Sequence, residues 1–267
     1  MIWQMWAIAA SIIAAGGFCL LIRLERKNLK FRKSLDMFHA EFGHEIKTPL
    51  NGIIGFSELL QDDGLPVEER KQYIGNLNLS AQTLLKLVSD LLDCAKYNLG
   101  KTQLHPVRTD LRQLCGELPV ILEALLQERD LRLAVEIPDD LPPLYIDAIK
   151  IRQILINLVG NAIKFSAGGT IRVRGEFHRT NSIYGMLVLQ VIDTGRGISN
   201  EYQKSIFDPF VQENRGDFGA GNGVGLGLAI TMKIIKLMKG KIRLKSETGK
   251  GSCFTITLPK INYDSFQ

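Results

Sequence analysis

Apolar residues recur every three or four positions from Phe31 to Leu60, which predicts a long amphipathic helix. The seam consists of Phe31, Leu35, Phe38, Phe42, Ile46, Pro49, Ile53, Phe56 and Leu60. Its one stutter falls between Phe42 and Ile46. After a Gly and Pro break at residues 62–66, the same spacing returns in Ile74, Leu77, Ala81, Leu84, Val88, Leu91 and Ala95. Two such helices joined by a short turn predict an antiparallel hairpin.

Neither helix of this hairpin can bury its seam alone. We therefore expect the hairpin, assigned to residues 35–100, to pair with a second copy as a four-helix bundle, which makes the chain a homodimer. The alternative is a monomeric helical subdomain that packs on the rest of the chain.

After Lys101 the pattern changes from long helices to shorter, mixed elements. Helices are predicted at Leu111–Arg129, Asp147–Phe165 and Val224–Met238. Strand-like patterns cover Arg132–Ile137, Thr170–Phe177, Met186–Ile192, Lys241–Ser246 and Cys253–Leu258. The mixture favours the α+β class, with a two-layer α/β sandwich at residues 101–260 and a short tail at 261–267.

The first 22 residues carry no charged side chain and, as a helix, can just span a hydrocarbon core of about 30 Å. Arg23, Arg26 and Lys27 follow directly, and no positive charge precedes the segment. The positive-inside rule then predicts a single-pass protein of the cell (inner) membrane, with a juxtamembrane linker at residues 23–34 and a cytoplasmic remainder. A cleaved signal peptide is the alternative, but the basic start of such a peptide is missing.

Charge and cysteine usage exclude two classes of site. The net charge is +5, and much of the excess lies between Arg23 and Lys33, beside the apolar segment. The rest has no basic stripe with interleaved aromatic residues, which argues against nucleic-acid binding. The four cysteines lie far apart without a CxxC pair, which argues against a zinc site and a disulfide framework.

His44 differs from an ordinary surface histidine because of its place on the first helix. It lies two residues from both Phe42 and Ile46, which is about 200° around the helix axis, so its imidazole should point away from the seam. Pro49 has no N–H for the carbonyl of Glu45, so the helix should bend nearby. An outward, reachable imidazole suits a nucleophile.

Phe42–Asn51, of sequence FGHEIKTPLN, resembles the phosphoacceptor box of histidine kinases. The resemblance implies that His44 is phosphorylated and that Glu45 accepts a hydrogen bond from one ring nitrogen, which leaves the other nitrogen as nucleophile. It also implies that Glu45 and Thr48 help to dephosphorylate a partner response regulator. The serine usual in that family is Gly43 here, which loosens the helix locally.

Two polar motifs of the second region suit a nucleotide. Asn157, Asn161 and Lys164 share one helical face, where amide oxygens and an ammonium fit a magnesium–triphosphate. The sequence DTGRG, at residues 193–197, follows a predicted strand. A carboxylate at Asp193 can accept from an adenine amino group, and the glycines let the backbone approach a ligand.

Two further motifs follow along the chain. Phe207–Phe210 puts two aromatic residues around a turn, and the glycine-rich Gly219–Gly227 leads into a helix whose first N–H groups can receive phosphate. In this order the four motifs resemble the N, G1, F and G2 boxes of the nucleotide-binding domain shared by histidine kinases, gyrase-type topoisomerases and a chaperone class. The resemblance implies ATP and Mg²⁺ as cofactors. The implied ATP-binding residues are Asn157, Asn161, Lys164, Phe165, Asp193, Gly195, Gly197, Phe210, Gly223, Val224, Gly225, Leu226 and Gly227.

The resemblance also implies individual roles. Asn161 is the principal Mg²⁺ ligand, with Asn157 beside it, and Lys164 contacts the phosphates. Phe165 lies on the adenine ring, and Asp193 reads the amino group of that ring.

Residues Gly195 and Gly197 are expected to shape the adenine pocket, and Gln212–Val224 to form a lid over the triphosphate. Two residues depart from the family pattern. Val224 replaces a common hydroxyl residue, and Gln212 stands where some members have an arginine near the γ-phosphate. Both departures weaken the expected contact with that phosphate.

The resemblance implies autophosphorylation of His44 by ATP, then transfer to an aspartate of a response regulator's receiver domain in trans. A hydrolytic ATPase of related fold is one alternative, but such enzymes carry a water-activating glutamate four residues before the metal asparagine. Asn157 occupies that position and is no base at neutral pH. A non-phosphorylating adaptor is a second alternative, against which the intact metal and adenine positions argue.

Overall fold

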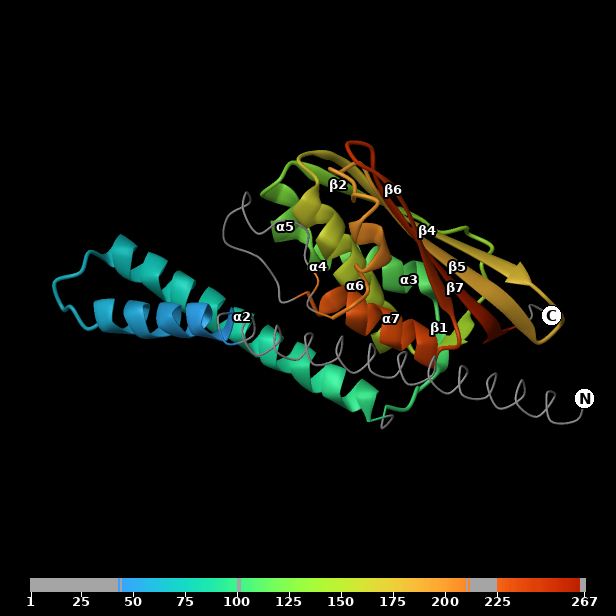
Figure 1. Ribbon diagram of the computed structural model, residues 1–267, viewed down its shortest axis with the longest axis horizontal. Coiled ribbons are helices and arrows are strands. Elements are labelled where there is room, and N and C mark those ends of the chain that lie inside the picture. Colours follow the sequence, from blue (N-terminus) through green and yellow to red (C-terminus); the bar gives the residue numbers. More distant parts are fainter. Residues whose placement is uncertain (1–42, 44, 100–101, 210, 212–224, 265–267) are drawn as a thin grey trace, which may run out of the picture. The chain divides into compact units, whose positions relative to one another are not determined.

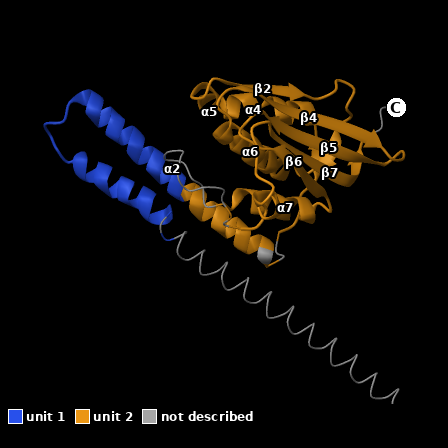
Figure 2. Cartoon of the chain, turned by 45° about the horizontal axis from the view of Figure 1, so that its top comes forward, with its two compact units in different colours: residues 1–84 blue, residues 85–267 orange. Residues whose placement is uncertain are grey.

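The computed structural model describes residues 43, 45–99, 102–209, 211 and 225–264. The chain divides into two compact units, Met1–Leu84 and Leu85–Gln267 (Figure 2). The predicted membrane segment at residues 1–22 and the linker at 23–34 lie outside the described residues. Within the described ranges, no helix combines the length and the apolar character that a membrane span requires.

A helical hairpin forms the first unit, as the spacing predicted. Residues 45–59 are helical, a turn follows, and helix α2 spans Val67–Asn98, so α2 continues into the second unit. The rings of Phe56 and Tyr73 lie 5.9 Å apart between the two helices. A Cβ on Gly52 would lie 2.7 Å from Ser80 Oγ, so this glycine lets the helices approach closely.

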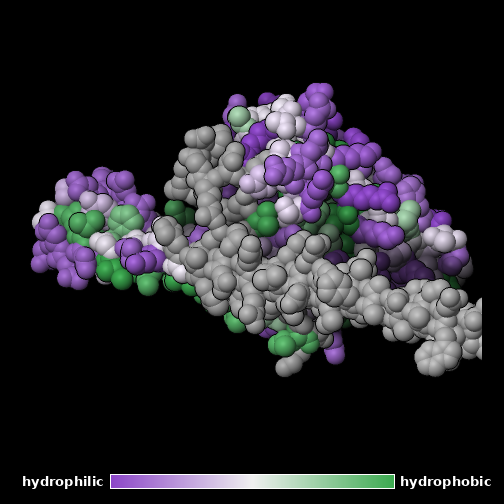
Figure 3. All heavy atoms as spheres, in the orientation of Figure 1, coloured by the Kyte–Doolittle hydropathy of each residue, from purple (hydrophilic) through white to green (hydrophobic). Residues whose placement is uncertain are grey.

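The predicted seam of the first helix faces inward. Its described members are all buried or half-buried: Ile46, Pro49, Ile53, Phe56 and Leu60. A second set of apolar side chains on the hairpin stays exposed, in part visible as green surface in Figure 3: Leu50, Ile54, Leu59, Ile74, Leu79, Leu85, Val88 and Leu92. Exposed apolar rows of this extent on two helices are typical of a surface that pairs with another.

A mixed, seven-stranded sheet forms one layer of the second unit (Figure 1). The strand order is β1-β3-β7-β5-β4-β2, and β6 pairs with β7 off this path. Among the strands that the structure describes, only β2 and β4 pair in parallel. The strands are β1 (Val107–Thr109), β2 (Leu131–Glu136), β3 (Leu144–Ile146), β4 (Gly169–Arg179), β5 (Tyr184–Asp193), β6 (Lys241–Glu247) and β7 (Gly251–Tyr263).

Helices cover one face of this sheet (Figure 1). The two that matter for the site are α6 (Ala148–Phe165) and α7 (Gly227–Leu237), which pack on each other. Along β5 buried residues alternate with half-buried ones, as expected for a sheet covered on one face. The α+β class and the sheet with its helical layer are therefore confirmed.

The predicted helix Leu111–Arg129 is wrong as one element. The structure has three short helices there: α3 (Leu111–Gly116), α4 (Leu118–Ile121) and α5 (Glu123–Gln127). Pro119 has no N–H to donate to the carbonyl of Cys115, so a continuous helix is disfavoured at that point. The short strands β1 and β3 and a 3₁₀ turn, η1 (Tyr202–Lys204), were not predicted.

Replacement of Asp147 tests how α6 is anchored. This residue is 5% exposed, caps α6 by accepting from Lys150 N at 3.1 Å, and also accepts from His105 N at 3.0 Å. We predict that Asp147→Ala lowers the free energy of unfolding by about 1–3 kcal/mol, because two part-buried N–H groups lose their acceptor. Urea unfolding followed by circular dichroism measures this.

Asp139→Ala is the matched control for this loss of a carboxylate. The Asp139 side chain is 95% exposed and pairs with Arg112 at 2.6 Å, so its removal should cost less than about 1 kcal/mol. Equal effects of the two substitutions would contradict the anchoring role of Asp147.

Candidate functional site

Helix α6 presents the three polar residues of the first nucleotide motif on one side. Asn157, Asn161 and Lys164 are all half-buried, whereas the opposite side of the helix is buried in the core. The side-chain amide of Asn161 makes no hydrogen bond to any described residue. Its oxygen is therefore available to a ligand, as the predicted metal contact requires.

Asn157 connects α6 to α7. Its Nδ2 donates to Thr231 Oγ1 at 2.8 Å, and a Cβ on Gly227 would lie 2.1 Å from its Oδ1. Residues of the first and last motifs, distant in the sequence, thus meet in the fold. Thr231 is almost fully buried and was not predicted as part of the site, because its role depends on a contact between two helices.

The last residue of α6, Phe165, is 40% exposed and lies beside the turn that follows β5. Arg196 Cζ lies 4.8 Å and Lys164 Nζ 5.3 Å from the centre of its ring. The backbone N–H of Arg196 donates to the carbonyl of Phe165 at 3.1 Å. Both cations lie over this exposed ring, and a flat ligand that stacks on the ring would share it with them.

Asp193 ends β5 with a carboxylate that is only 8% exposed. Its Oδ1 accepts from Gly195 N at 2.9 Å and Ser252 N at 3.1 Å. No described donor reaches its other oxygen. Burial raises the pKa of this carboxyl, and the two backbone N–H groups counteract part of that rise. A buried carboxylate with one oxygen left over can accept from an N–H of a ligand.

The predicted site positions require glycine for different structural reasons. A Cβ on Gly195 would lie 2.5 Å from the carbonyl oxygen of Phe165, so the site itself needs this close approach. Gly197, at φ +68°, instead packs against the backbone of Glu247. Gly225 has φ +72°, a value that favours glycine.

The start of α7 offers backbone groups rather than side chains. The Leu226 side chain is buried, so only its backbone can face a ligand. The N-cap residue of α7, Leu226, makes no side-chain hydrogen bond to the N–H groups of the first turn. An anion suits this position.

Four predicted site residues, His44, Phe210, Gly223 and Val224, lie outside the described residues, as does the predicted lid. On the first helix, Glu45 is half-buried and Thr48 is exposed.

The other aromatic residue of the third motif, Phe207, packs edge-to-face on Phe254 with ring centres 6.4 Å apart. It therefore contacts the sheet through β7.

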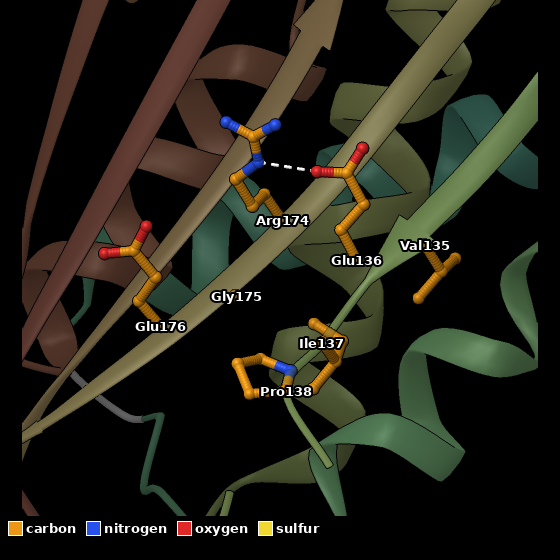
Figure 4. A pocket seen from close by; sticks show the side chains of 7 residues that line it. All are labelled: Val135, Glu136, Ile137, Pro138, Arg174, Gly175 and Glu176. Atoms are coloured by element: carbon orange, nitrogen blue, oxygen red, sulfur yellow. Dashed lines mark hydrogen bonds and ion pairs between the residues drawn. The ribbon is translucent and has the colours of Figure 1, made fainter. Parts of the chain in front are cut away.

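A hollow of about 390 Å³ lies elsewhere, beside β2 and β4 (Figure 4). Its charged residues include Glu136 and Arg174, which pair at 2.6 Å, and Glu176. None of the predicted site residues lines it. It is therefore not part of the candidate site.

The site residues fit an adenine nucleotide. They provide a buried acceptor, an exposed ring and uncapped helical N–H groups at the ends of α6, β5 and α7. In the described part of the chain, no three His, Cys, Asp or Glu side chains gather as a metal site. A magnesium ion would therefore depend on amide oxygens and on the phosphates themselves.

Two family descriptions match the chain. Residues 34–100 match the His Kinase A (phospho-acceptor) domain, and residues 146–262 match the histidine kinase-, DNA gyrase B-, and HSP90-like ATPase domain. The two segments correspond to the predicted hairpin and to most of the predicted sandwich.

Individual proteins agree with these matches. The chain is 31% identical, over 94% of its length, to the autoinducer 2 sensor kinase/phosphatase LuxQ of Vibrio parahaemolyticus, of which it spans 30%. It is similar to full-length ShkA in complex with AMPPNP, with a TM-score of 0.65, 28% identity, and coverage of 86% of this chain and 46% of ShkA. The kinase ThkA in complex with the response regulator TrrA gives a TM-score of 0.60, 25% identity, and coverage of 86% and 64%.

Gly227→Ala tests the contact between α6 and α7. We predict that the new methyl group displaces the Asn157 side chain and lowers the affinity for a fluorescent ATP analogue by about tenfold, because the methyl has no space 2.1 Å from Oδ1. Titration by fluorescence measures the affinity.

Gly160→Ala, on the same helix α6, is the control. A Cβ there meets nothing within 4 Å, so affinity should stay unchanged and α6 should gain up to about 1 kcal/mol in stability. If both variants bind the analogue like the original chain, the Gly227 contact plays no part in the site.

Proposed function

Because the chain belongs to the sensor histidine kinases, we propose that it moves the γ-phosphoryl group of ATP to His44 and then to an aspartate of a cytoplasmic response regulator. The observation that carries this proposal is the buried Asp193 carboxylate, with one oxygen left over, beside the exposed ring of Phe165. The chain spans about 30% of LuxQ, so the activity of the whole protein is part of the proposal.

The nucleotide is held at both of its ends. Asp193 accepts from the adenine amino group, and the ring of Phe165 stacks on the base. Gly195 lets the turn after β5 approach the end of α6, and Gly197 lets it approach the end of β6. ATP, when bound, supplies the phosphoryl group. The first N–H groups of α7 and the ammonium of Lys164 stabilise the charge that develops on the phosphates.

Asn161 is the proposed protein ligand of Mg²⁺, because its amide oxygen makes no other hydrogen bond to a described residue. Asn157 keeps its nitrogen on Thr231 and directs its oxygen toward Gly227, so it positions α7 as well as the ion. A hydrolytic role would need a general base, and an amide cannot accept the proton of water at neutral pH.

The phosphoacceptor chemistry belongs to the first helix. One nitrogen of neutral His44 attacks the γ-phosphorus, a P–N bond forms, and the bond to the ADP oxygen breaks. Glu45 accepts a hydrogen bond from the other ring nitrogen and stabilises the positive charge on the ring. The phosphoryl group then passes to the aspartate of the regulator. We also propose that Glu45 and Thr48 support phosphatase activity toward the regulator; LuxQ is itself named a sensor kinase/phosphatase.

We further propose a homodimer at the cell (inner) membrane. The exposed apolar side chains of the hairpin, such as Ile54, Ile74 and Val88, support pairing of two hairpins into a four-helix bundle. Residues 1–22 form the proposed membrane segment, residues 23–34 the linker, and the ATP-binding domain lies in the cytoplasm. Residues 35–100 and 101–260 are the proposed domains that carry His44 and ATP.

Labelled ATP tests the phosphoacceptor. We predict that the chain gains an acid-labile, base-stable label, that His44→Gln abolishes it, and that His105→Gln leaves it unchanged. Retention of the label in the His44 variant would refute the assignment.

A second substitution tests the ATP-binding domain separately. Asn161→Ala should lower the initial labelling rate by about 100-fold or more. The reason is that the Mg²⁺ ion that neutralises charge on the phosphates loses its proposed protein ligand. The circular dichroism of the helices should not change. An unchanged rate would exclude Asn161 as the metal ligand.

A further inference from the structure

Ser166 carries a buried hydroxyl for which no role has been given. This residue follows α6 directly and is 1% exposed, and its Oγ has no hydrogen-bond partner among the described residues. Burial of an unpaired hydroxyl costs about 1–3 kcal/mol, so a serine there requires an explanation. Nearby hydroxyls differ, since those of Ser246 and Ser252 bond to each other at 3.0 Å.

The surroundings of this hydroxyl point to the nucleotide site. A Cβ placed on Gly195 would lie 2.9 Å from Ser166 Oγ and 3.0 Å from Asp193 Oδ1. The hydroxyl and the buried carboxylate therefore face the same side of Gly195. Phe165, with its exposed ring, is the residue before Ser166.

A purely structural role does not account for the serine. Ser166 is the C-cap residue of α6 with extended backbone angles, φ −105° and ψ 138°, but its hydroxyl bonds to no carbonyl of the helix. Alanine would fill this position without burying an unpaired polar atom. The polar atom is explained if its partner is a buried water molecule or a ligand.

We propose that the Ser166 hydroxyl is a second purine-reading group of the site and acts with Asp193 through one buried water molecule. This rests on the proposed function as an ATP-binding kinase. Ser166 is too buried to touch the base directly, so it orients the water. Adenine presents a donor at its amino group and an acceptor at N1. Asp193 accepts from the amino group, and the water donates to N1.

The arrangement discriminates between purines. Guanine reverses the pattern, with an acceptor at its oxygen and a donor at N1. It therefore fails to satisfy both the carboxylate and the oriented water. Loss of the Ser166 hydroxyl should consequently affect binding of ATP more than binding of GTP.

The experiment compares ATP and GTP affinities of the full chain by calorimetry for Ser166→Ala and Ser166→Cys. Cysteine keeps nearly the same volume but is a weak hydrogen-bonding group. For both variants we expect ATP affinity to fall about fivefold or more, GTP affinity to change less than about twofold, and the thermal midpoint of the free chain to stay unchanged or rise.

Thr109→Val is the matched control, because it removes a buried hydroxyl that bonds to Val107 O at 2.9 Å on β1, away from the site. It should change neither affinity. An unchanged ratio of ATP to GTP affinity in both Ser166 variants, or an equal loss of both with a lower thermal midpoint, would overturn the role of Ser166. If the original chain binds no ATP, the proposed function itself fails.

Discussion

Seven apolar side chains of α6 are buried in the core of the second unit, and the candidate site depends on this burial. Ile154 and Leu158 on the buried side fix the rotation of the helix about its axis. Asn157 and Asn161 then point in a similar direction on the other side, one helical turn apart. Rotation by one residue, about 100°, would bury an amide and expose an isoleucine. The rotation of α6 that buries its apolar side chains in the core therefore also presents the polar side chains on the other side.

Close packing also determines how the buried carboxylate of the site is stabilised. Asp193 is removed from water, which disfavours its ionised form, but the backbone N–H groups of Gly195, in the turn after β5, and of Ser252, in β7, stabilise the carboxylate. The turn and the start of β7 approach so closely because Gly195 and Gly251 have no side chain; a Cβ on Gly251 would lie 2.1 Å from the carbonyl oxygen of Asp193. The other oxygen accepts from no residue that the structure describes, and it lies in a buried place where water competes little with a ligand.

Sequence patterns predicted those parts whose causes are local. The polar face of α6 and the helical hairpin follow from residue spacing, and the carboxylate at the end of β5 was identified from the motif DTGRG and its resemblance to a known family. Strands β1 and β3 were missed because three residues are too few to show an alternation. The contact of Asn157 with Thr231 and the unpaired hydroxyl of Ser166 depend on which elements pack together, and no spacing along the chain encodes that.

The end of helix α2 bonds to both α6 and α7 within the second unit. Its last turns belong to this unit, where Asp93 accepts from Gln153 of α6 at 2.9 Å and Cys94 accepts from Lys233 of α7 at 3.1 Å. Gln153 lies one turn before Asn157, which itself bonds to α7. A change in the separation of α6 and α7 must therefore strain the end of α2 and the Asn157 contact together. Since α2 begins in the hairpin and ends in the second unit, one continuous helix belongs to both units.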